Sequence, residues 1–354
     1  MSLKAFFIVF FLTASVEPAK IVQGLSGDAS VAKTKTPRTK LVIDHDGGAD
    51  DAMAIFMALL NEKYFNGPEV VAITTCHANV PEPQVYINTR KFLDLTDRND
   101  VPIFRGSNQS LVKGTPSDFF FGHDGLGDLP EEQHQNHHHY TATAKSKHAV
   151  LALIDLTKKY KDNLTIVALG ALTNIALAIR LDPTFISRLG HLYIGAGNLY
   201  GDAEHSKTAE FNALNDVEAY YVVAENATPD KVTVVPFSQV RISLNVSLDW
   251  RINVLGSIPT EIMKTQTMYE RLALQKESTW AFLDPATMAM VLDKNVIDQV
   301  VLSNNSIILE GERRGINTND WSDPKKANVR LIYSAHEEAY KKLLLSLFSA
   351  EIVS

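Results

Sequence analysis

Five short runs rich in β-branched residues recur along the chain, and segments with helical spacing lie between them. The runs are KLVID (40–44), EVVAITT (69–75), LTIVAL (164–169), HLYIGAG (191–197) and KVTVVP (231–236). Near-continuous apolar strands are typical of a parallel sheet covered on both faces, because a strand with one face in water alternates apolar and polar residues. Helical spacing is found at 50–64, 84–97, 148–161, 172–181 and 215–226. The pattern predicts a single α/β domain over residues 40–354, with a mostly parallel central sheet flanked by helices in an open, Rossmann-like arrangement.

Composition excludes several classes of partner. With 354 residues and 45% apolar content, the chain can bury a substantial core. Its formal net charge is −7, so it lacks the basic field that holds a nucleic-acid backbone. The single cysteine, Cys76, excludes an intrachain disulfide. Beyond the N-terminus, no apolar stretch reaches membrane-spanning length. From the net charge we expect no nucleic acid as partner, and from the lack of a long apolar stretch we expect no membrane.

The N-terminal residues resemble an export signal. Lys4 precedes an apolar stretch from Ala5 to Leu12, and small residues follow. This stretch is too short to span a bilayer but suits a secretory signal peptide, which we place at residues 1–19 and expect to be followed by a flexible lead at 20–39. Five glycosylation sequons agree with a secreted, extracellular protein, and they begin at Asn108, Asn163, Asn226, Asn245 and Asn304.

Polar residues follow directly after three of the predicted strands. They are DHDGGADD (44–51), HAN (77–79) and GNLYGDAEHSKTAEFN (197–212). In open parallel sheets, ligands bind outside the carboxyl ends of the strands. The sequence therefore predicts that these three segments meet at one ligand site.

Four aspartates, Asp44, Asp46, Asp50 and Asp51, crowd the first of these segments. A helix N-terminus stabilises each carboxylate by only about 0.3–1 kcal/mol, which is too little to hold four acids around one turn. Closely spaced carboxylate oxygens suit Ca²⁺ or Mg²⁺. A helix cap with solvated acids is the simpler alternative. A phosphatase of the haloacid dehalogenase type, with Asp44 as nucleophile and Asp46 as acid, is another, but it leaves the remaining two aspartates unexplained.

The aspartate pattern and its context resemble the inosine-uridine preferring nucleoside hydrolase family. The family signature D-x-D-x-G-x-D-D is matched by residues 44–51. The resemblance continues, in order, through ITTCHAN, HDGLGDLP, VALGALTNIALAIRLDP, GAGNLYGDAEHSKTAEFNALND and FLDPATMA, and covers residues 40 to about 295. It implies the open nucleoside hydrolase fold and a nucleoside as small-molecule substrate. It also implies a homodimer or homotetramer.

The resemblance further implies a Ca²⁺-dependent nucleoside N-ribohydrolase. In such a reaction a bound cation lowers the pKa of its water and a carboxylate takes the proton, while the sugar becomes oxocarbenium-like. Asp46 would be the general base and a calcium ligand. The implied further metal ligands are Asp51, Asp284 and the Leu169 carbonyl. The implied contacts to the ribose hydroxyls are Asp50, Asn79, Asn198, Glu210 and Asn212. Asp44 would support the ligands without touching the metal. A site that holds every ribose hydroxyl should reject 2′-deoxynucleosides.

The leaving-group side departs from the family pattern. Pyrimidine-active relatives carry a histidine before the late aspartate, where this chain has Leu283, and another common histidine position is occupied by Phe121. Purine-specific relatives instead stack the base between aromatic rings. We therefore expect a preference for purine ribonucleosides (inosine, adenosine, guanosine), with Phe121 and Trp280 as base contacts and Phe119, Phe120 and Phe282 nearby.

Several alternatives stay open at the level of sequence. The missing histidines allow a catalytically silent nucleoside-binding protein, although a full set of metal ligands argues against it. His123 is a candidate for a displaced proton donor. The cluster His134, His137, His138 and His139 could bind a transition metal but is more typical of a solvated loop. Residues 311–321 fit either a subunit contact or a strand pair.

Overall fold

A computed structural model describes residues 38–117, 119–130, 141–199 and 209–353. The predicted signal peptide and nearly all of the predicted lead lie outside these residues, as does the histidine cluster around His137. None of the helices in the described ranges is both long and apolar enough to span a bilayer.

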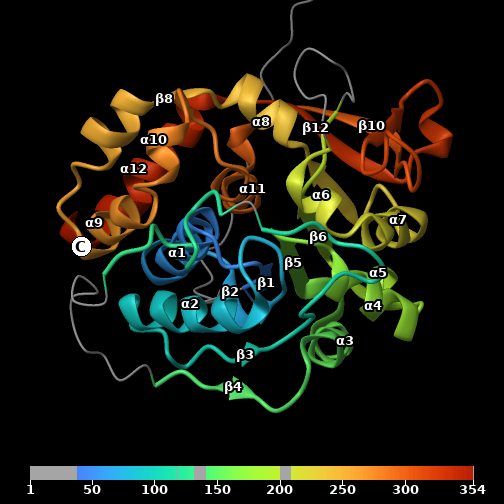
Figure 1. The fold of residues 1–354 in the computed structure, drawn as a ribbon, viewed down its shortest axis with the longest axis horizontal. Coiled ribbons are helices and arrows are strands. Elements are labelled where there is room, and N and C mark those ends of the chain that lie inside the picture. The colour runs from blue at the N-terminus through green and yellow to red at the C-terminus, as the bar shows by residue number, and fades with distance from the viewer. Residues whose placement is uncertain (1–37, 118, 131–140, 200–208, 354) are drawn as a thin grey trace, which may run out of the picture. The chain divides into compact units, whose positions relative to one another are not determined.

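One mixed sheet of ten strands runs through the described part of the chain, in the order β11-β10-β12-β7-β6-β5-β1-β2-β3-β4 (Figure 1). Its strands are β1 (Lys40–His45), β2 (Glu69–Thr75), β3 (Ile103–Phe104), β4 (Ala144–Lys145), β5 (Leu164–Ala168), β6 (His191–Gly195), β7 (Val232–Val235), β10 (Ile297–Ile307), β11 (Asn317–Asp320) and β12 (Val329–Ala335). All neighbours from β12 to β4 pair in parallel, whereas β10 runs antiparallel to β12 and β11. The α/β fold with a mostly parallel central sheet is thus confirmed.

The five predicted apolar runs form the contiguous centre of this sheet, β7-β6-β5-β1-β2. Central strands are buried on both faces, which is why their sequences carry little alternation. The strands that the five apolar runs did not predict lie toward the two edges of the sheet. β3 and β4 have two residues each, and β10 reads IDQVVLSNNSI, in which Asp298, Gln299 and Asn304 are exposed whereas Ser303 and Asn305 are buried.

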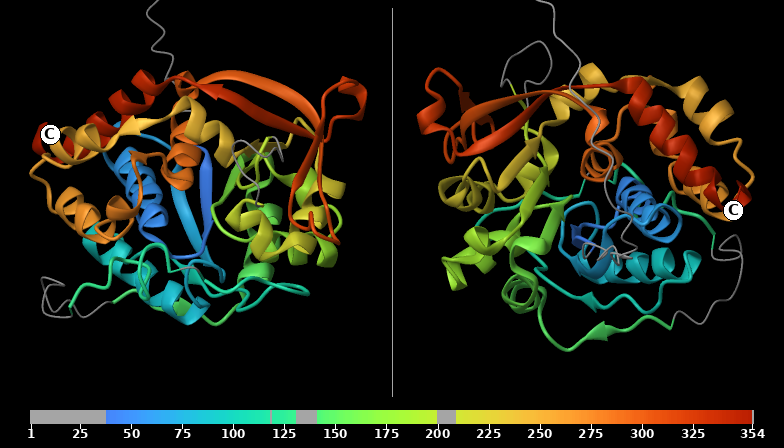
Figure 2. Two further views of the ribbon diagram at one scale, coloured as in Figure 1. Left: turned by 45° about the horizontal axis from the view of Figure 1, so that its top comes forward. Right: turned by 180° about the vertical axis from the view of Figure 1, so that it is seen from behind.

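Helices cover both faces of the sheet and enclose two apolar clusters (Figure 2). One face carries α1 (Ala49–Phe65), α2 (Glu82–Leu95), α9 (Glu261–Tyr269), α11 (Leu283–Leu292) and α12 (Glu337–Val353). The other carries α3 (Ala149–Tyr160), α4 (Thr173–Leu181), α5 (Phe185–Arg188) and α7 (Val217–Asn226). The shorter elements are α6 (Phe211–Asn215), α8 (Phe237–Ser243), α10 (Ala273–Lys276), a π-helix at Trp250–Leu255, 3₁₀ turns at Lys161–Asn163, Lys294–Val296 and Pro324–Lys326, and the strand pair β8 (Val246–Ser247) and β9 (Thr279–Trp280).

Helix α1 is buried along most of its length, from Ala49 to Asn61. It is apolar all round rather than amphipathic, because it packs against β2, α11 and α12 as well as its other neighbours. Burial of the whole helix carries its N-terminal acids into the interior. The fold therefore places the first-turn residues Asp50 and Asp51 at the carboxyl end of the central strands, out of bulk water.

The segment 311–321 forms a strand pair, since β11 pairs with β10. The Asn317 side-chain oxygen accepts a hydrogen bond from the Asn198 backbone N–H at 3.1 Å. The Asn319 side chain donates to the Leu199 carbonyl at 2.7 Å. This hairpin therefore fixes the turn after β6 that carries Asn198.

Candidate active site

The turn between β1 and α1 depends on two glycines. Gly47 has φ +86°, a conformation that side chains with a Cβ rarely adopt. A Cβ on Gly48 would lie 2.9 Å from the Asp50 carboxylate and 3.0 Å from both Asn79 and Phe121. The tight turn thus lets the two strand-end segments and the phenylalanine converge on the start of α1.

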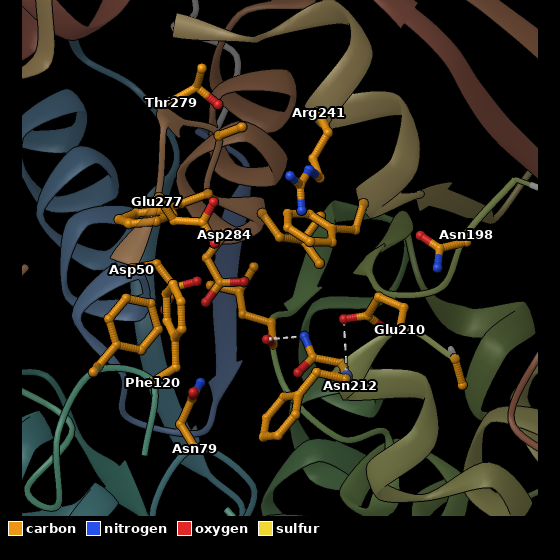
Figure 3. A pocket seen from close by; sticks show the side chains of 18 residues that line it. Asp50, Asn79, Phe120, Asn198, Glu210, Asn212, Arg241, Glu277, Thr279 and Asp284 are labelled. Atoms are coloured by element: carbon orange, nitrogen blue, oxygen red, sulfur yellow. Dashed lines mark hydrogen bonds between the residues drawn. The ribbon is translucent and has the colours of Figure 1, made fainter. Parts of the chain in front are cut away.

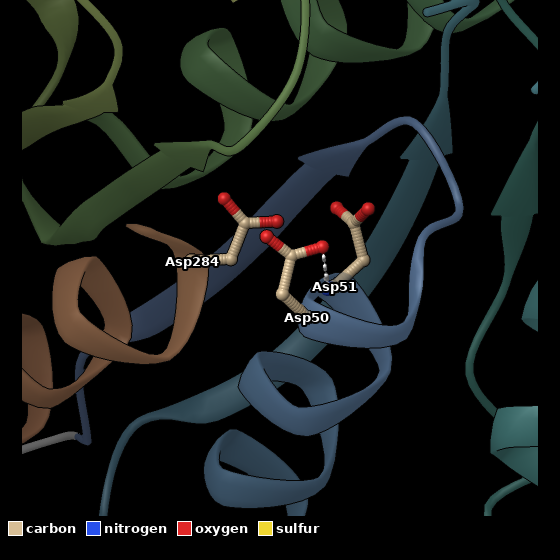
Figure 4. Close-up of side chains that lie close together, drawn as sticks. All are labelled: Asp50, Asp51 and Asp284. Atoms are coloured by element: carbon tan, nitrogen blue, oxygen red, sulfur yellow. Dashed lines mark hydrogen bonds between the residues drawn. The ribbon is translucent and has the colours of Figure 1, made fainter. Parts of the chain in front are cut away.

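Three carboxylates meet at this point. Ligand oxygens of Asp50, Asp51 and Asp284 all lie within 4.8 Å of one another (Figure 4). The first two begin α1, and Asp284 lies in the first turn of α11, so two helix N-termini face each other. The Asp51 side chain also accepts a hydrogen bond from the Gly48 N–H at 2.7 Å.

Burial and mutual repulsion raise the pKa of each of these acids. For Asp51 burial is the larger cause and the charge of Asp284 the next; for Asp284 burial is followed by the charge of Asp50. His45 lies 3.7 Å from the Asp51 carboxylate, but burial lowers its pKa to about 3, so it is neutral and offers no compensating charge. One oxygen of Asp284 is buried without a hydrogen-bond partner among the described residues.

This cluster fits a hard metal ion. Its donors are all carboxylate oxygens, they are close enough to share one ion, and a divalent cation would relieve their repulsion. Asp51 and Asp284 belong to the predicted ligand set, and Asp50 adds a third carboxylate to them; Asp46 and the Leu169 carbonyl stay predicted ligands. Long-range packing brings the three acids together, since α11 places Asp284 against both first-turn acids of α1.

Asp46 is fully buried behind Asn79. One of its carboxylate oxygens accepts a hydrogen bond from the Asn79 side chain at 2.7 Å, and the other from the Asn79 backbone at 3.1 Å. Burial raises the pKa of Asp46, and these hydrogen bonds partly oppose the rise. The predicted base and the predicted ribose contact are therefore joined directly.

The strand-end residues of β5 and β6 form the other side of the site. The Asn212 side chain donates to the Leu169 carbonyl at 2.7 Å and to the Gly195 carbonyl at 2.9 Å (Figure 3). Glu210 caps α6, where its carboxylate accepts hydrogen bonds from the backbone N–H groups of Asn212 and Ala213 at 2.9 Å. Burial raises the pKa of Glu210 to about 7, despite these bonds and one from Gly197.

Asp44 lies below the site rather than in it. Its carboxylate accepts hydrogen bonds from the Thr74 hydroxyl and from the Asn174 side chain, the latter at 2.8 Å. The same Asn174 accepts from the Ser107 backbone at 2.9 Å. Burial raises the pKa of Asp44 to about 7. The aspartate thus ties β1 to its neighbour β2, to α4 and to the loop after β3.

Most of the predicted site residues line a pocket of about 340 Å³, which is the size of a small-molecule site. Asp44, Asp46 and Asp51 are not part of its described lining. The predicted residues that line it are Asp50, Asn79, Phe121, Leu169, Asn198, Glu210, Asn212 and Asp284. Phe120 and Phe282, which were expected near the base, also line it, as does Leu283, which stands where relatives have a histidine. Lining residues that the sequence did not single out are Ala209, Phe211, Phe237, Arg241, Glu277, Thr279 and Ala281. Arg241 could have been predicted from the sequence, because it lies shortly after the strand-like run KVTVVP, just as the aspartates lie shortly after the run KLVID.

Three phenylalanine rings form one wall of the pocket. Phe121 meets Phe120 edge to face with ring centroids 4.9 Å apart, and meets Phe282 edge to face at 5.6 Å. Trp280 does not line the pocket, although its ring packs against Phe282 from the core side, with ring centroids 5.7 Å apart. Its indole is fully buried, donates to Glu270 at 3.1 Å and stacks on Tyr340. Side chains alternate along β9, so Thr279 faces the pocket and Trp280 faces the core.

Histidines are absent from the described lining of the pocket. His123 is exposed and packs on the ring of Phe119, with centroids 4.3 Å apart, instead of reaching the pocket. His77 lies two residues before the pocket residue Asn79, but its ring nitrogen is hydrogen-bonded to the Thr173 hydroxyl at 3.1 Å. The described lining of the pocket therefore offers phenylalanine rings and no histidine.

Comparisons with known proteins agree with this geometry. Residues 41–342 match the family described as inosine-uridine preferring nucleoside hydrolase. The chain is 28% identical over 298 residues to the inosine-uridine preferring nucleoside hydrolase of Leishmania major, a match covering 82% of this chain and 90% of the relative. It is 34% identical to the probable uridine nucleosidase 2 of Arabidopsis thaliana, but that match covers 52% of this chain and just over half, 56%, of the relative. The solved structure of an inosine-guanosine nucleoside hydrolase superposes with a TM-score of 0.78 at 27% identity, covering 87% of this chain and 98% of the other.

Proposed function

The chain belongs to the inosine-uridine preferring nucleoside hydrolase family of N-glycosyl hydrolases, and we propose that it is a secreted, Ca²⁺-dependent enzyme that splits purine ribonucleosides into ribose and free base. The observation that carries the purine preference is the wall of Phe120, Phe121 and Phe282, in a described lining that holds no histidine. Flat rings offer a purine a large stacking surface. A similar structure is named for inosine and guanosine, whereas several relatives are named for uridine, so base preference must come from the pocket itself.

The chain's own residues bind the sugar and activate the attacking water. Asn79, Asn198, Glu210 and Asn212 bind the ribose hydroxyls, and the carboxylates around Asp50 favour the positive charge that grows on the sugar. When held by Asp50, Asp51 and Asp284, Ca²⁺ supplies the charge that lowers the pKa of a water and orients it. Asp46 accepts the proton of the attacking water, and Asn79 holds both oxygens of that carboxylate in place.

The family match and the pocket also bear on two other functions. A phosphatase is not kept, because residues 41–342 match the nucleoside hydrolase family. A catalytically silent nucleoside-binding protein is favoured by one observation, the lack of a histidine among the described lining residues. Turnover separates this protein from an enzyme.

The purified protein should release free base and ribose from inosine, adenosine and guanosine. Uridine turnover should be lower by about tenfold or more, and 2′-deoxyinosine turnover by about a hundredfold or more, because a missing hydroxyl leaves buried polar groups unpaired. The measurement is product analysis by chromatography, with and without chelator. Strong cleavage of uridine would contradict the purine preference. Nucleoside binding without base release would leave the silent binding protein in its place.

Export is a second part of the proposal. Expressed in secreting eukaryotic cells, the protein should appear in the medium with a new N-terminus after one of residues 14–19, and its mass should fall on treatment with peptide N-glycosidase. Four of the five sequon asparagines, at positions 108, 226, 245 and 304, are solvent-exposed. Retention in the cell with an intact N-terminus would contradict export. We further propose a homodimer or homotetramer, which light scattering would test.

A further inference from the structure

The charges that line the pocket are unevenly distributed. Carboxylates come from four residues, Asp50, Glu210, Glu277 and Asp284, whereas Arg241 is the one cationic side chain in the described lining. Arg241 extends into the pocket from α8, on the side away from Asn79 (Figure 3). Breaking an N-glycosidic bond also separates charge: the sugar becomes positive, which suits the carboxylates, and the electron pair leaves with the base, which suits the arginine.

The side chain of Arg241 is exposed at the rim of the pocket and lies beside an aromatic ring of its own helix. Its guanidinium lies 5.7 Å from the ring centroid of Phe237, which also lines the pocket. Helix α8 is bound to the predicted ribose contact Asn198, whose side chain accepts a hydrogen bond from the Ser238 N–H at 3.1 Å. The Leu199 N–H donates to the Ser238 hydroxyl at 2.9 Å. The position of Arg241 is thereby coupled to the part of the pocket that holds the sugar.

The guanidinium of Arg241 is not paired with any carboxylate of the described residues. Among the described residues, no acid lies within ion-pair distance of Arg241, including Glu277 on the facing rim. Glu277, as a carboxylate, would oppose negative charge on a departing base. Leu283 and Phe121 occupy the two positions where a histidine was expected, and neither carries a proton to give.

We propose that Arg241 stabilises the departing nucleobase, an inference that rests on the hydrolase function proposed above. The bond between C1′ of the ribose and the base nitrogen breaks, and its electron pair goes to the base. A new C1′–O bond forms to water, whose proton passes to Asp46. The N–H groups of Arg241 donate hydrogen bonds to the basic atoms of the base, which then takes its proton from solvent. Arg241 thus performs in this chain the task left without a histidine.

The test compares leaving groups that differ in their need for help. Arg241→Met should lower kcat/KM for inosine by about tenfold to a hundredfold. It should change kcat/KM for 4-nitrophenyl β-D-ribofuranoside by less than about threefold, because nitrophenolate departs without protonation or a strong hydrogen bond. Arg241→Lys, which keeps the charge but loses the planar fork, should fall between the wild type and Arg241→Met on inosine. Arg180→Met, which removes an exposed positive charge on α4, is the matched control and should match the wild type on both substrates.

Four outcomes would overturn the inference. Equal losses on the two substrates would mean that Arg241 only maintains the pocket. No loss on either would mean that it is not used. A selective loss on inosine in Glu277→Gln, with Arg241→Met unaffected, would assign the leaving group to the glutamate. A wild type that cleaves the nitrophenyl riboside but no nucleoside would overturn the proposed function as well, which separates the two failures.

Discussion

Asp46→Asn should lower kcat/KM for inosine by about a thousandfold, within the range that general bases contribute. Asparagine keeps the shape of the side chain but cannot accept the proton of the attacking water. Its amide would also face the Asn79 donors, which lie 2.7 and 3.1 Å from the two carboxylate oxygens of the wild type. Steady-state kinetics on inosine would measure the loss.

Two controls separate lost chemistry from lost structure in this variant. Asp155→Asn removes a solvent-exposed carboxylate from α3 and should behave as the wild type, since its ion pair with Lys147 is a surface pair. Asp46→Asn should still melt cooperatively and bind inosine. Burial raises the pKa of Asp46, so wild-type kcat/KM should fall as the solution is acidified and the base becomes protonated. Retention of a tenth or more of the wild-type activity would refute Asp46 as the base.

The sequence predicted the centre of the sheet because that part of the fold follows from local pattern. The runs that became β1, β2, β5, β6 and β7 are apolar on both sides, and a strand with this pattern is stable only between two helical layers. The edge strands could not be predicted in the same way. β3 and β4 have two residues each; β3 exists because β2 offers it a partner and β4 because β3 does, not because of their own composition.

The site was predictable where it follows directly from strand ends, and less so where it depends on packing. Asn79, Leu169 and Asn198 each follow a predicted strand, and all three line the pocket. Trp280 was misplaced because a two-residue strand gives no period from which to tell its inner face from its outer one. The contact of Asp50 with Asp284 joins residues far apart in the chain, and no local pattern encodes it.

Calcium should raise the melting temperature of the protein by roughly 4 °C at a hundredfold excess over its Kd. The reason is the cluster of Asp50, Asp51 and Asp284, whose negative charges repel one another without a cation. Removal of calcium by a chelator should also lower kcat/KM by about a hundredfold or more. Differential scanning fluorimetry and kinetics measure the two effects. A melting temperature that does not respond to calcium would contradict a metal at this cluster.

The sign of the pH dependence gives a sharper test. The folded-state pKa values of these acids lie well above their ordinary values, and that of Glu210 is about 7. A raised folded pKa adds stability below the unfolded pKa, and this stability is lost as the pH rises through the folded pKa. The chelated protein should therefore melt at lower temperature as the pH rises from about 5 to about 8. Calcium binds the ionised carboxylates, so its stabilising effect should grow over the same range. Asp284→Asn removes one of the repelling charges and should raise the melting temperature of the chelated protein while weakening its response to calcium. A chelated protein that becomes more stable toward pH 8 would show that these acids are compensated by protein groups instead.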